Sequence, residues 1–304
     1  MKKLLFAGIA IALSHFVLAA PAQAATITVT HAQGGTELPE NPRKVLVFDL
    51  ASLDTLDALG VEVGGVPSGN LPAYLSKYAS DDIAKVGSLF EPDFEAVNAA
   101  EPDLIIVGGR SSPKYAELSR LAPTIDMTLD QSDYLGSMKK NVETLARIFG
   151  KEEEAAKRLA ALDEAVAGLR KSGGEAGSVL VILTTGGRMS AHGPGSRFGV
   201  VYADFGLKPA AEGLDTGNHG QAISNEFILE TNPDWLFVVD RDAAIGREGQ
   251  AARQLLDNEL VAQTTAWKND QVVYLDPASW YLVGGGLTAI GNSVKQISDA
   301  FARN

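Results

Sequence analysis

Apolar residues in this chain form two kinds of pattern. Continuous runs of strand length occur at Val45–Phe48, Leu104–Val107, Ser178–Leu183 and Trp235–Val239. Such runs are typical of strands that are covered on both faces of a parallel sheet. Glu152–Leu169 differs, because its apolar residues recur every three or four positions, as on one face of a long helix. The alternation of buried strands and helices predicts an α/β fold with mainly parallel sheets.

One unit of this pattern occurs twice. Glu95–Arg110 and Glu226–Arg241 share a leading Glu, a Pro-Asp pair, a Val and a closing Arg at identical spacing. Each copy predicts a short helix, a turn and a buried strand, because proline lacks an N–H and disfavours helical geometry in the residue before it. Ligands bind beyond the carboxyl ends of strands in open α/β sheets. Arg110 and Arg241 are therefore expected on two lobes that face each other across a cleft, although helix–turn–strand units recur in many α/β proteins.

The boundaries of these lobes follow from the flanking segments. Residues 1–24 combine two lysines, an apolar run and an Ala-Gln-Ala cleavage site, which predicts a signal peptide and export to a periplasm. The N-terminal lobe is then 25–150, the linker helix 151–173 and the C-terminal lobe 174–304. A long helix between two lobes predicts a stiff hinge with small opening motions.

Composition limits the possible partners. The 304 residues contain no cysteine, so there is no site for a lipid anchor, and a freely diffusing protein without a membrane anchor is expected. The formal net charge is −12, and loss of the signal peptide with its two lysines makes it −14. Such a surface argues against nucleic acid and anionic membranes. An anionic ligand would need a local cluster of arginines.

The motifs do not indicate an enzyme. Gly193–Gly199 leads into a helix predicted at about Phe198–Phe205 and contains Arg197, an arrangement that can bind an anion. It lacks the Lys-Ser/Thr ending of a P-loop. The chain also has no HExxH motif or cysteine pair for zinc and no GxSxG elbow. We therefore expect neither catalysis nor an intrinsic cofactor.

Four aromatic or imidazole side chains are candidates for ligand contact, and of the two histidines only His219 is expected at the edge of the predicted cleft. His192 and His219 are expected in glycine-rich loops, with His219 just before the second copy of the repeat. Trp280 and Tyr281 follow a predicted strand and are expected in a loop, where they either cap the core or line a ligand wall.

Arginines beside an imidazole and a phenol suit a polyanionic complex of a hard metal. Catecholate oxygens around Fe(III) leave net negative charge, which arginines meet with charge-assisted hydrogen bonds. A chelator that supplies four oxygens leaves two iron positions, which one imidazole and one phenolate could fill.

At these residues the sequence resembles the periplasmic siderophore-binding proteins of the ferric-catecholate type, the solute-binding components of ABC importers. The resemblance covers the mature chain and includes the Glu-Pro-Asp-Leu unit together with Asn41–Val45, Gly195–Gly199, Asn218–Gly220 and Trp280-Tyr281. It implies the class III fold of periplasmic binding proteins, with two lobes joined by one long α-helix. It also implies a monomer that delivers its ferric siderophore to a permease dimer.

The resemblance implies roles for cleft residues. Arg110, Arg197 and Arg241 match the arginines that contact the catecholates, and Trp280 is expected beside the ligand. His219 and Tyr281 match the two residues that complete the coordination of iron in members that take tetradentate bis-catecholates. Fe(III) then arrives as part of the siderophore.

The resemblance also implies a docking role and leaves the ligand partly open. Glu95 and Glu226 match the glutamates, one on each lobe, that dock onto arginines of the permease. Haem, cobalamin and ferric hydroxamates are alternative ligands of the same transport fold. The arginines favour an anion over neutral or cationic hydroxamates.

Overall fold

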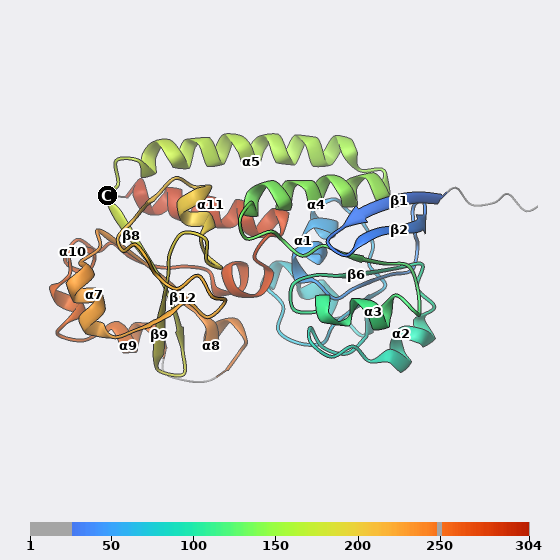
Figure 1. Ribbon diagram of the computed structural model, residues 1–304, viewed down its shortest axis with the longest axis horizontal. Helices are drawn as coiled ribbons and strands as arrows, with labels where there is room; N and C mark the ends of the chain where they lie inside the picture. The colour runs from blue at the N-terminus through green and yellow to red at the C-terminus, as the bar shows by residue number, and fades with distance from the viewer. Residues whose placement is uncertain (1–25, 248–250, 304) are drawn as a thin grey trace, which may run out of the picture.

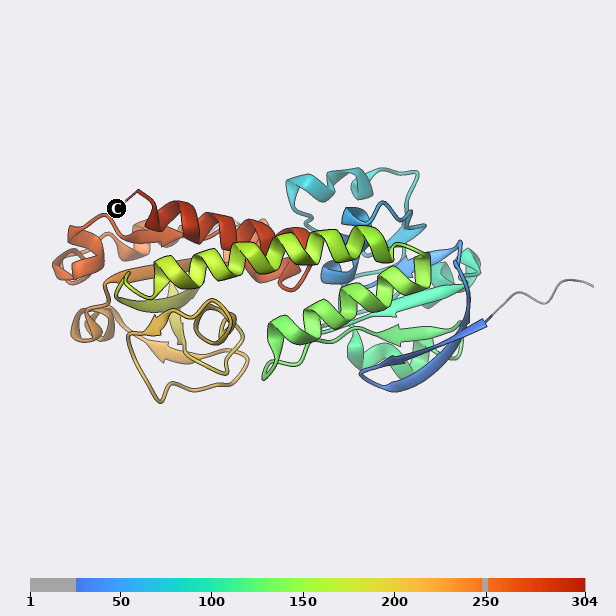
Figure 2. The same ribbon diagram turned by 90° about the horizontal axis from the view of Figure 1, so that it is seen from above.

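The computed structural model describes residues 26–247 and 251–303. The predicted signal peptide at 1–24 lies outside the described residues. The sequence also predicts a helical region from Gln250 to Leu256, of which Gln250 lies outside the described residues. Two lobes lie side by side, and helix α5 (Glu152–Gly173) runs along both of them (Figures 1 and 2). The predicted α/β fold with two lobes and a long linking helix is confirmed, whereas the lobe boundaries and the stiffness of the hinge stay predictions.

The sheet of the N-terminal lobe is parallel throughout. In the described part of the chain it has five strands in the order β5-β4-β3-β6-β7, and the strands at its centre are fully buried. The strands are β3 (Val45–Val47), β4 (Gly65–Val66), β5 (Ala84–Lys85), β6 (Leu104–Val107) and β7 (Thr124–Asp126). Around them lie an antiparallel ribbon, β1 (Thr26–His31) and β2 (Gly34–Pro39), a 3-10 helix (Ala73–Ala79), and helices α1 (Leu50–Ala58), α2 (Phe94–Ala100), α3 (Tyr115–Leu118) and α4 (Tyr134–Phe149).

The sheet of the C-terminal lobe is mixed but mainly parallel. Its six described strands follow the order β11-β9-β8-β12-β13, with β10 also pairing with β8. They are β8 (Ser178–Thr185), β9 (Arg188–His192), β10 (Lys208–Pro209), β11 (Gln221–Ile223), β12 (Trp235–Asp240) and β13 (Val272–Tyr274). Short helices surround them: α6 (Val200–Ala203), α7 (Asn225–Thr231), α8 (Arg241–Ala244), α9 (Ala252–Leu256) and α10 (Thr265–Lys268).

The repeated unit folds in the same way in both lobes. Each copy is a short helix followed by a buried strand, α2 with β6 and α7 with β12. Both helices end at a residue in the left-handed region, Glu101 (φ 45°) and Asn232 (φ 42°), directly before the proline. The next residue, Asp103 or Asp234, accepts hydrogen bonds from main-chain N–H groups beside the neighbouring strand, at 2.9 Å and 2.7 Å respectively. The Pro-Asp pair therefore ends the helix and also fixes the position of the strand.

Helix α11 (Leu287–Phe301) holds the lobes together at a second place. It lies beside α5, and its N-terminus reaches α1 of the N-terminal lobe (Figure 2). There the buried carboxylate of Asp54 accepts hydrogen bonds from the N–H groups of Thr288 (2.7 Å) and Ala289 (3.0 Å) and from the hydroxyl of Tyr74 (2.6 Å). Burial raises the pKa of Asp54. The lobes are thus joined by α5 and also by this buried contact.

Candidate ligand-binding cleft

A cleft of about 1160 Å³ lies between the two lobes. Its walls include the residues that follow β3 and β6 in one lobe, and the end of β8 and the residue that follows β12 in the other. This is the position in which α/β sheets bind ligands. The cleft brings together all of the residues that the sequence predicted for ligand or iron contact, namely Arg110, Arg197, His219, Arg241, Trp280 and Tyr281.

Tyr281 lies at the centre of this group. Its main-chain carbonyl accepts hydrogen bonds from Nη2 of Arg110 (2.6 Å) and Nη2 of Arg197 (2.7 Å), and its phenolic oxygen accepts one from Nε of Arg241 (2.7 Å). The guanidinium of Arg197 lies 4.2 Å from the centre of the tyrosine ring, and those of Arg110 and Arg241 lie 5.3 Å and 5.5 Å away. Arginines from both lobes therefore converge on one aromatic side chain.

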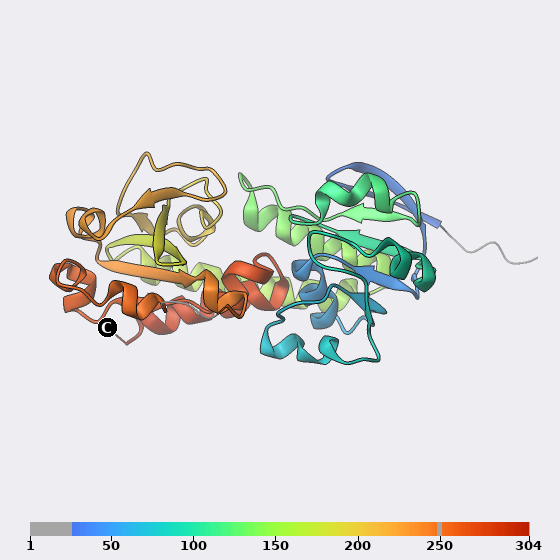
Figure 3. The same cartoon turned by 90° about the horizontal axis from the view of Figure 1, so that it is seen from below.

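The segment that carries Tyr281 is helical, and its prediction as a loop was wrong. Ala278–Val283 forms one turn of π-helix, which lies between the lobes (orange-red in Figure 3). The turn ends with a hydrogen bond from the N–H of Gly284 to the carbonyl of Ser279, five residues back, at 2.8 Å. Gly284 has a φ of 65°, a conformation that glycine adopts without strain. Single π-turns frequently occur at functional sites.

Trp280 points into the core from the same turn. Its side chain is only 6% exposed and packs edge-on against Phe198 and Phe205, although it also contributes to the cleft wall. The indole N–H is buried and has no hydrogen-bond partner. Trp280 therefore caps the core and also contributes to the cleft wall, which are the two positions that the sequence left open. Its contact with a ligand stays a prediction.

The surrounding charges change the acidity of Tyr281. Burial alone would raise the pKa of the phenol, but the hydrogen bond from Arg241 and the positive charges of Arg197, Arg241 and Arg110 outweigh burial and lower the pKa below its ordinary value. A phenol with a lowered pKa forms a phenolate more readily. The Tyr281 oxygen is therefore suited to contact a cation, while the guanidiniums around it are suited to contact anions.

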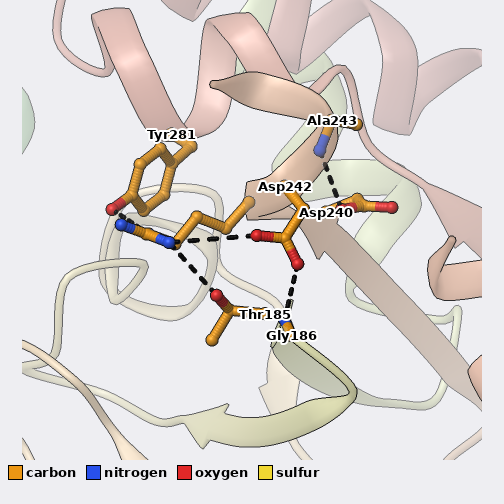
Figure 4. Close-up of polar contacts among 7 residues, drawn as sticks. Thr185, Gly186, Asp240, Asp242, Ala243 and Tyr281 are labelled. Atoms are coloured by element: carbon orange, nitrogen blue, oxygen red, sulfur yellow. Dashed lines mark hydrogen bonds and ion pairs between the residues drawn. The ribbon is translucent and has the colours of Figure 1, made fainter. Parts of the chain in front are cut away.

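Arg241 is fixed by its own lobe. Its Nη1 donates a 3.2 Å hydrogen bond to the hydroxyl of Thr185 and lies 3.9 Å from a carboxylate oxygen of Asp242 (Figure 4). Asp240 accepts a hydrogen bond from the N–H of Ala243 at 3.1 Å and so caps α8, the short helix that Arg241 begins (Figure 4). These contacts limit the directions in which the guanidinium can point.

The two histidines differ in exposure. His219 is exposed in the cleft wall, whereas His192, predicted in a loop, is the last residue of β9 and fully buried. Burial, together with the charges of Arg197 and His219, lowers the pKa of His192 to about 4. The ring of His192 lies under Gly220, where a Cβ would come within 2.7 Å of it. Glycine at 220 thus lets the loop that carries His219 pass directly over this buried ring.

The two glutamates predicted to dock the permease lie outside the cleft wall. Glu95 and Glu226 are exposed in the first turns of α2 and α7, at matching positions of the repeat. Asp93 and Ser224 cap these helices by accepting main-chain hydrogen bonds. Their position leaves the glutamates accessible, and their docking role stays a prediction.

Several cleft residues were not singled out from the sequence. Asp49 lies two residues after the end of β3 and caps α1, so the rule that found the arginines after β6 and β12 would also have found it. Burial raises the pKa of Asp49, and the positive charge of Arg110 opposes that rise. Arg188, Tyr134 and Phe90 also line the cleft, but no sequence pattern marks them.

Within residues 26–247 and 251–303, no group of three or more His, Cys, Asp or Glu side chains could hold a metal ion. The helices among these residues include none that is both long and apolar enough to span a bilayer.

Comparison with known proteins gives consistent matches. A family model described as "Periplasmic binding protein" matches residues 45–279. The petrobactin-binding protein YclQ of Bacillus subtilis is 44% identical over 282 residues, which cover 91% of this chain and 89% of YclQ. The ferric-anguibactin-binding protein FatB of Vibrio anguillarum is 33% identical over 270 residues, which cover 87% of this chain and 84% of FatB.

Solved structures match along the same length. The crystal structure of YclQ superposes with a TM-score of 0.89 and covers 92% of this chain and 100% of the other. The periplasmic catecholate-siderophore binding protein VctP of Vibrio cholerae is 34% identical, with a TM-score of 0.87, covering 90% of this chain and 100% of VctP.

Proposed function

Because this chain belongs to the periplasmic binding protein family, we propose that it captures a ferric catecholate siderophore and delivers it to an ABC importer for iron uptake. It acts in this role as a binding protein and not as an enzyme. The observation that carries the proposal is the convergence of Arg110, Arg197 and Arg241 on Tyr281 in the cleft. The names of the relatives, which bind petrobactin, ferric anguibactin and catecholate siderophores, support the same ligand class.

The arginines bind the negative charge of the chelate. Among the described residues, the recorded hydrogen-bond partners of these guanidiniums are neutral oxygens, and the nearest carboxylate, on Asp242, lies 3.9 Å from Arg241. Exchange of a neutral oxygen for a catecholate oxygen gives a charge-assisted hydrogen bond, which is about twice as strong. The cleft therefore favours an anionic complex although the protein as a whole is acidic.

Tyr281 and His219 complete the coordination of iron when the chelator supplies only four oxygens. The lowered pKa of Tyr281 favours the phenolate that binds Fe(III). His219 is exposed in the cleft wall, where its imidazole is accessible to the bound complex. A hexadentate chelate fills all six iron positions itself and is held by the arginines alone.

Delivery depends on the outer surface. Glu95 and Glu226 present one carboxylate on each lobe, and we propose that each binds an arginine-rich surface of one subunit of a permease dimer. The binding protein acts as a monomer in the periplasm, and Fe(III) is cargo that arrives and leaves within the siderophore.

Fluorescence titration tests the ligand class. Trp280 lies in the cleft wall and reports on occupancy. A ferric bis-catecholate should quench the protein fluorescence in a saturable way, while haem, cobalamin, a ferric hydroxamate and the iron-free catecholate should not. Saturable quenching by haem, cobalamin or the hydroxamate, with none by the ferric catecholate, would refute the proposed ligand.

A further inference from the structure

A smaller recess of about 150 Å³ opens beside the cleft. It shares Arg110, Arg241 and Tyr281 with the cleft, together with four apolar residues, and the walls that belong to the recess alone come from the loop 67–71 and from Ile245. Because both cavities share the guanidiniums, the recess is directly accessible to a ligand whose anionic part is held by these arginines.

The recess differs from the cleft in chemical character. Apart from the shared arginines and Tyr281, its lining is mostly apolar, with contributions from Leu50, Pro67, Leu71, Leu89, Phe90 and Ile245. Of its polar residues Ser68 and Asn70, Asn70 is engaged elsewhere, because its Nδ2 donates a 2.9 Å hydrogen bond to the carbonyl of Ala244 on the other lobe. This bond joins the two lobes beside the recess. Mostly apolar walls next to a few charged groups are typical of sites that bind organic ligands.

Phe90 stands at the edge that the recess and the cleft share. At 59% exposure it is the most exposed large hydrophobic residue of the described surface. A tight turn holds it there: the N–H of Ser88 donates to the carbonyl of Glu91 (2.8 Å), and the hydroxyl of Ser88 accepts from the N–H of Glu91 (3.0 Å). The ring is therefore presented by a fixed turn, and a ligand that covers it removes apolar surface from water.

We propose that this recess is an apolar subsite that binds the uncharged organic arm of the ferric chelate, and that Phe90 is a residue that determines specificity for that arm. The inference deepens the proposed function and rests on it. The arginines bind the metal-chelating part, which many ferric catecholates share, whereas the recess distinguishes between chelates that differ in their linker.

Two chelates with the same iron-binding part test the subsite. Both are ferric tetradentate bis-catecholates, and one carries an n-butyl group on its linker. Wild-type protein should bind the butyl chelate about tenfold more tightly, the size expected when two methylene groups are buried. Phe90→Ala removes the aromatic edge and Ser68→Leu narrows the recess from the loop, and each should reduce the ratio of the two dissociation constants below twofold. Leu121→Ala, which removes the other exposed large hydrophobic residue of the described surface, should leave the ratio unchanged.

The outcomes separate the two proposals. A wild-type ratio near one, with both chelates bound, would overturn the subsite and leave the proposed function intact. A tenfold ratio that survives Phe90→Ala would overturn the role of Phe90, and one that also survives Ser68→Leu would overturn the subsite. Binding of neither chelate by the wild type would refute the proposed function and the subsite with it.

Discussion

The Nε of Arg241 donates a 2.7 Å hydrogen bond to the phenolic oxygen of Tyr281. The contact joins the residue that follows β12 to the π-turn between the lobes. It fixes the phenolic oxygen as an acceptor and contributes to the lowered pKa of the phenol. Since Arg110 and Arg197 both donate to the carbonyl of the same tyrosine, Tyr281 contacts three arginines of the cleft.

The first prediction concerns direct contact with iron. Tyr281→Phe and His219→Ala should each weaken a tetradentate ferric bis-catecholate by about tenfold or more, the scale of one lost charge-assisted contact. A hexadentate ferric tris-catecholate should be affected much less, because it leaves no iron position open. Dissociation constants from fluorescence titration measure this difference. Equal losses for both chelates would remove the claim of direct coordination.

The second prediction concerns delivery. Glu95→Ala and Glu226→Ala should leave the affinity for the ferric chelate within about twofold, because neither residue lines the cleft, and should reduce iron uptake by cells. Glu117→Ala and Glu230→Ala are matched controls, since these glutamates are also exposed on helices of the same two lobes. A loss of affinity in the Glu95 or Glu226 variants would instead assign those carboxylates to the cleft or the fold.

The third prediction concerns the contact between Asp54 and α11. Asp54→Ala leaves two main-chain N–H groups of α11 and the hydroxyl of Tyr74 without their buried acceptor, so the free energy of unfolding should fall by about 3 kcal/mol. Tyr74→Phe removes only one of these bonds and should cost about 1 kcal/mol. Urea unfolding measures both values. Similar losses in the two variants would show that the cap of α11 adds little.

The fourth prediction concerns acid stability. The pKa of His192 is lowered from 6.5 to about 4 by burial and by the nearby charges of Arg197 and His219. The unfolded chain therefore binds a proton below pH 6.5 that the folded protein does not bind until about pH 4, and stability falls as the pH is lowered through this window. The loss should reach about 2 to 3 kcal/mol at pH 4.5.

His192→Gln isolates the contribution of His192 to the loss of stability in acid, because glutamine does not titrate and all other titratable groups of the protein are unchanged. Urea unfolding at pH 7 and pH 4.5 should show a smaller acid loss in the variant than in the wild type. An identical pH dependence in the two proteins would contradict the buried neutral state of His192.

The sequence predicted the parts of the site that local pattern determines. Arg110 and Arg241 could be placed at the cleft because each closes a copy of the repeated unit, whose Pro-Asp pair fixes the strand before it. The long helix followed from its spacing of apolar residues. Arg197 was identified within a glycine-rich stretch, although the helix after it, expected from Phe198 to Phe205, is only α6 (Val200–Ala203).

The parts of the site that the sequence did not predict depend on contacts between distant segments. Arg110 donates a hydrogen bond to the carbonyl of Tyr281, which lies 171 positions further along the chain, and no local pattern encodes that pairing. The π-turn that directs Trp280 inward and Tyr281 outward also lacks a sequence signature. Strand β9 was missed because the glycines that flank it suggested a loop, so the burial of His192 could not be expected.

Removal of the arginines one at a time tests the central claim most directly. Arg110→Gln, Arg197→Gln and Arg241→Gln should each weaken a ferric catecholate about 10- to 100-fold, since each removes a charge-assisted hydrogen bond. Arg253→Gln is the control, because Arg253 stacks on Tyr274 and does not line the cleft. Dissociation constants that stay within twofold of the wild type in all three cleft variants would contradict the account.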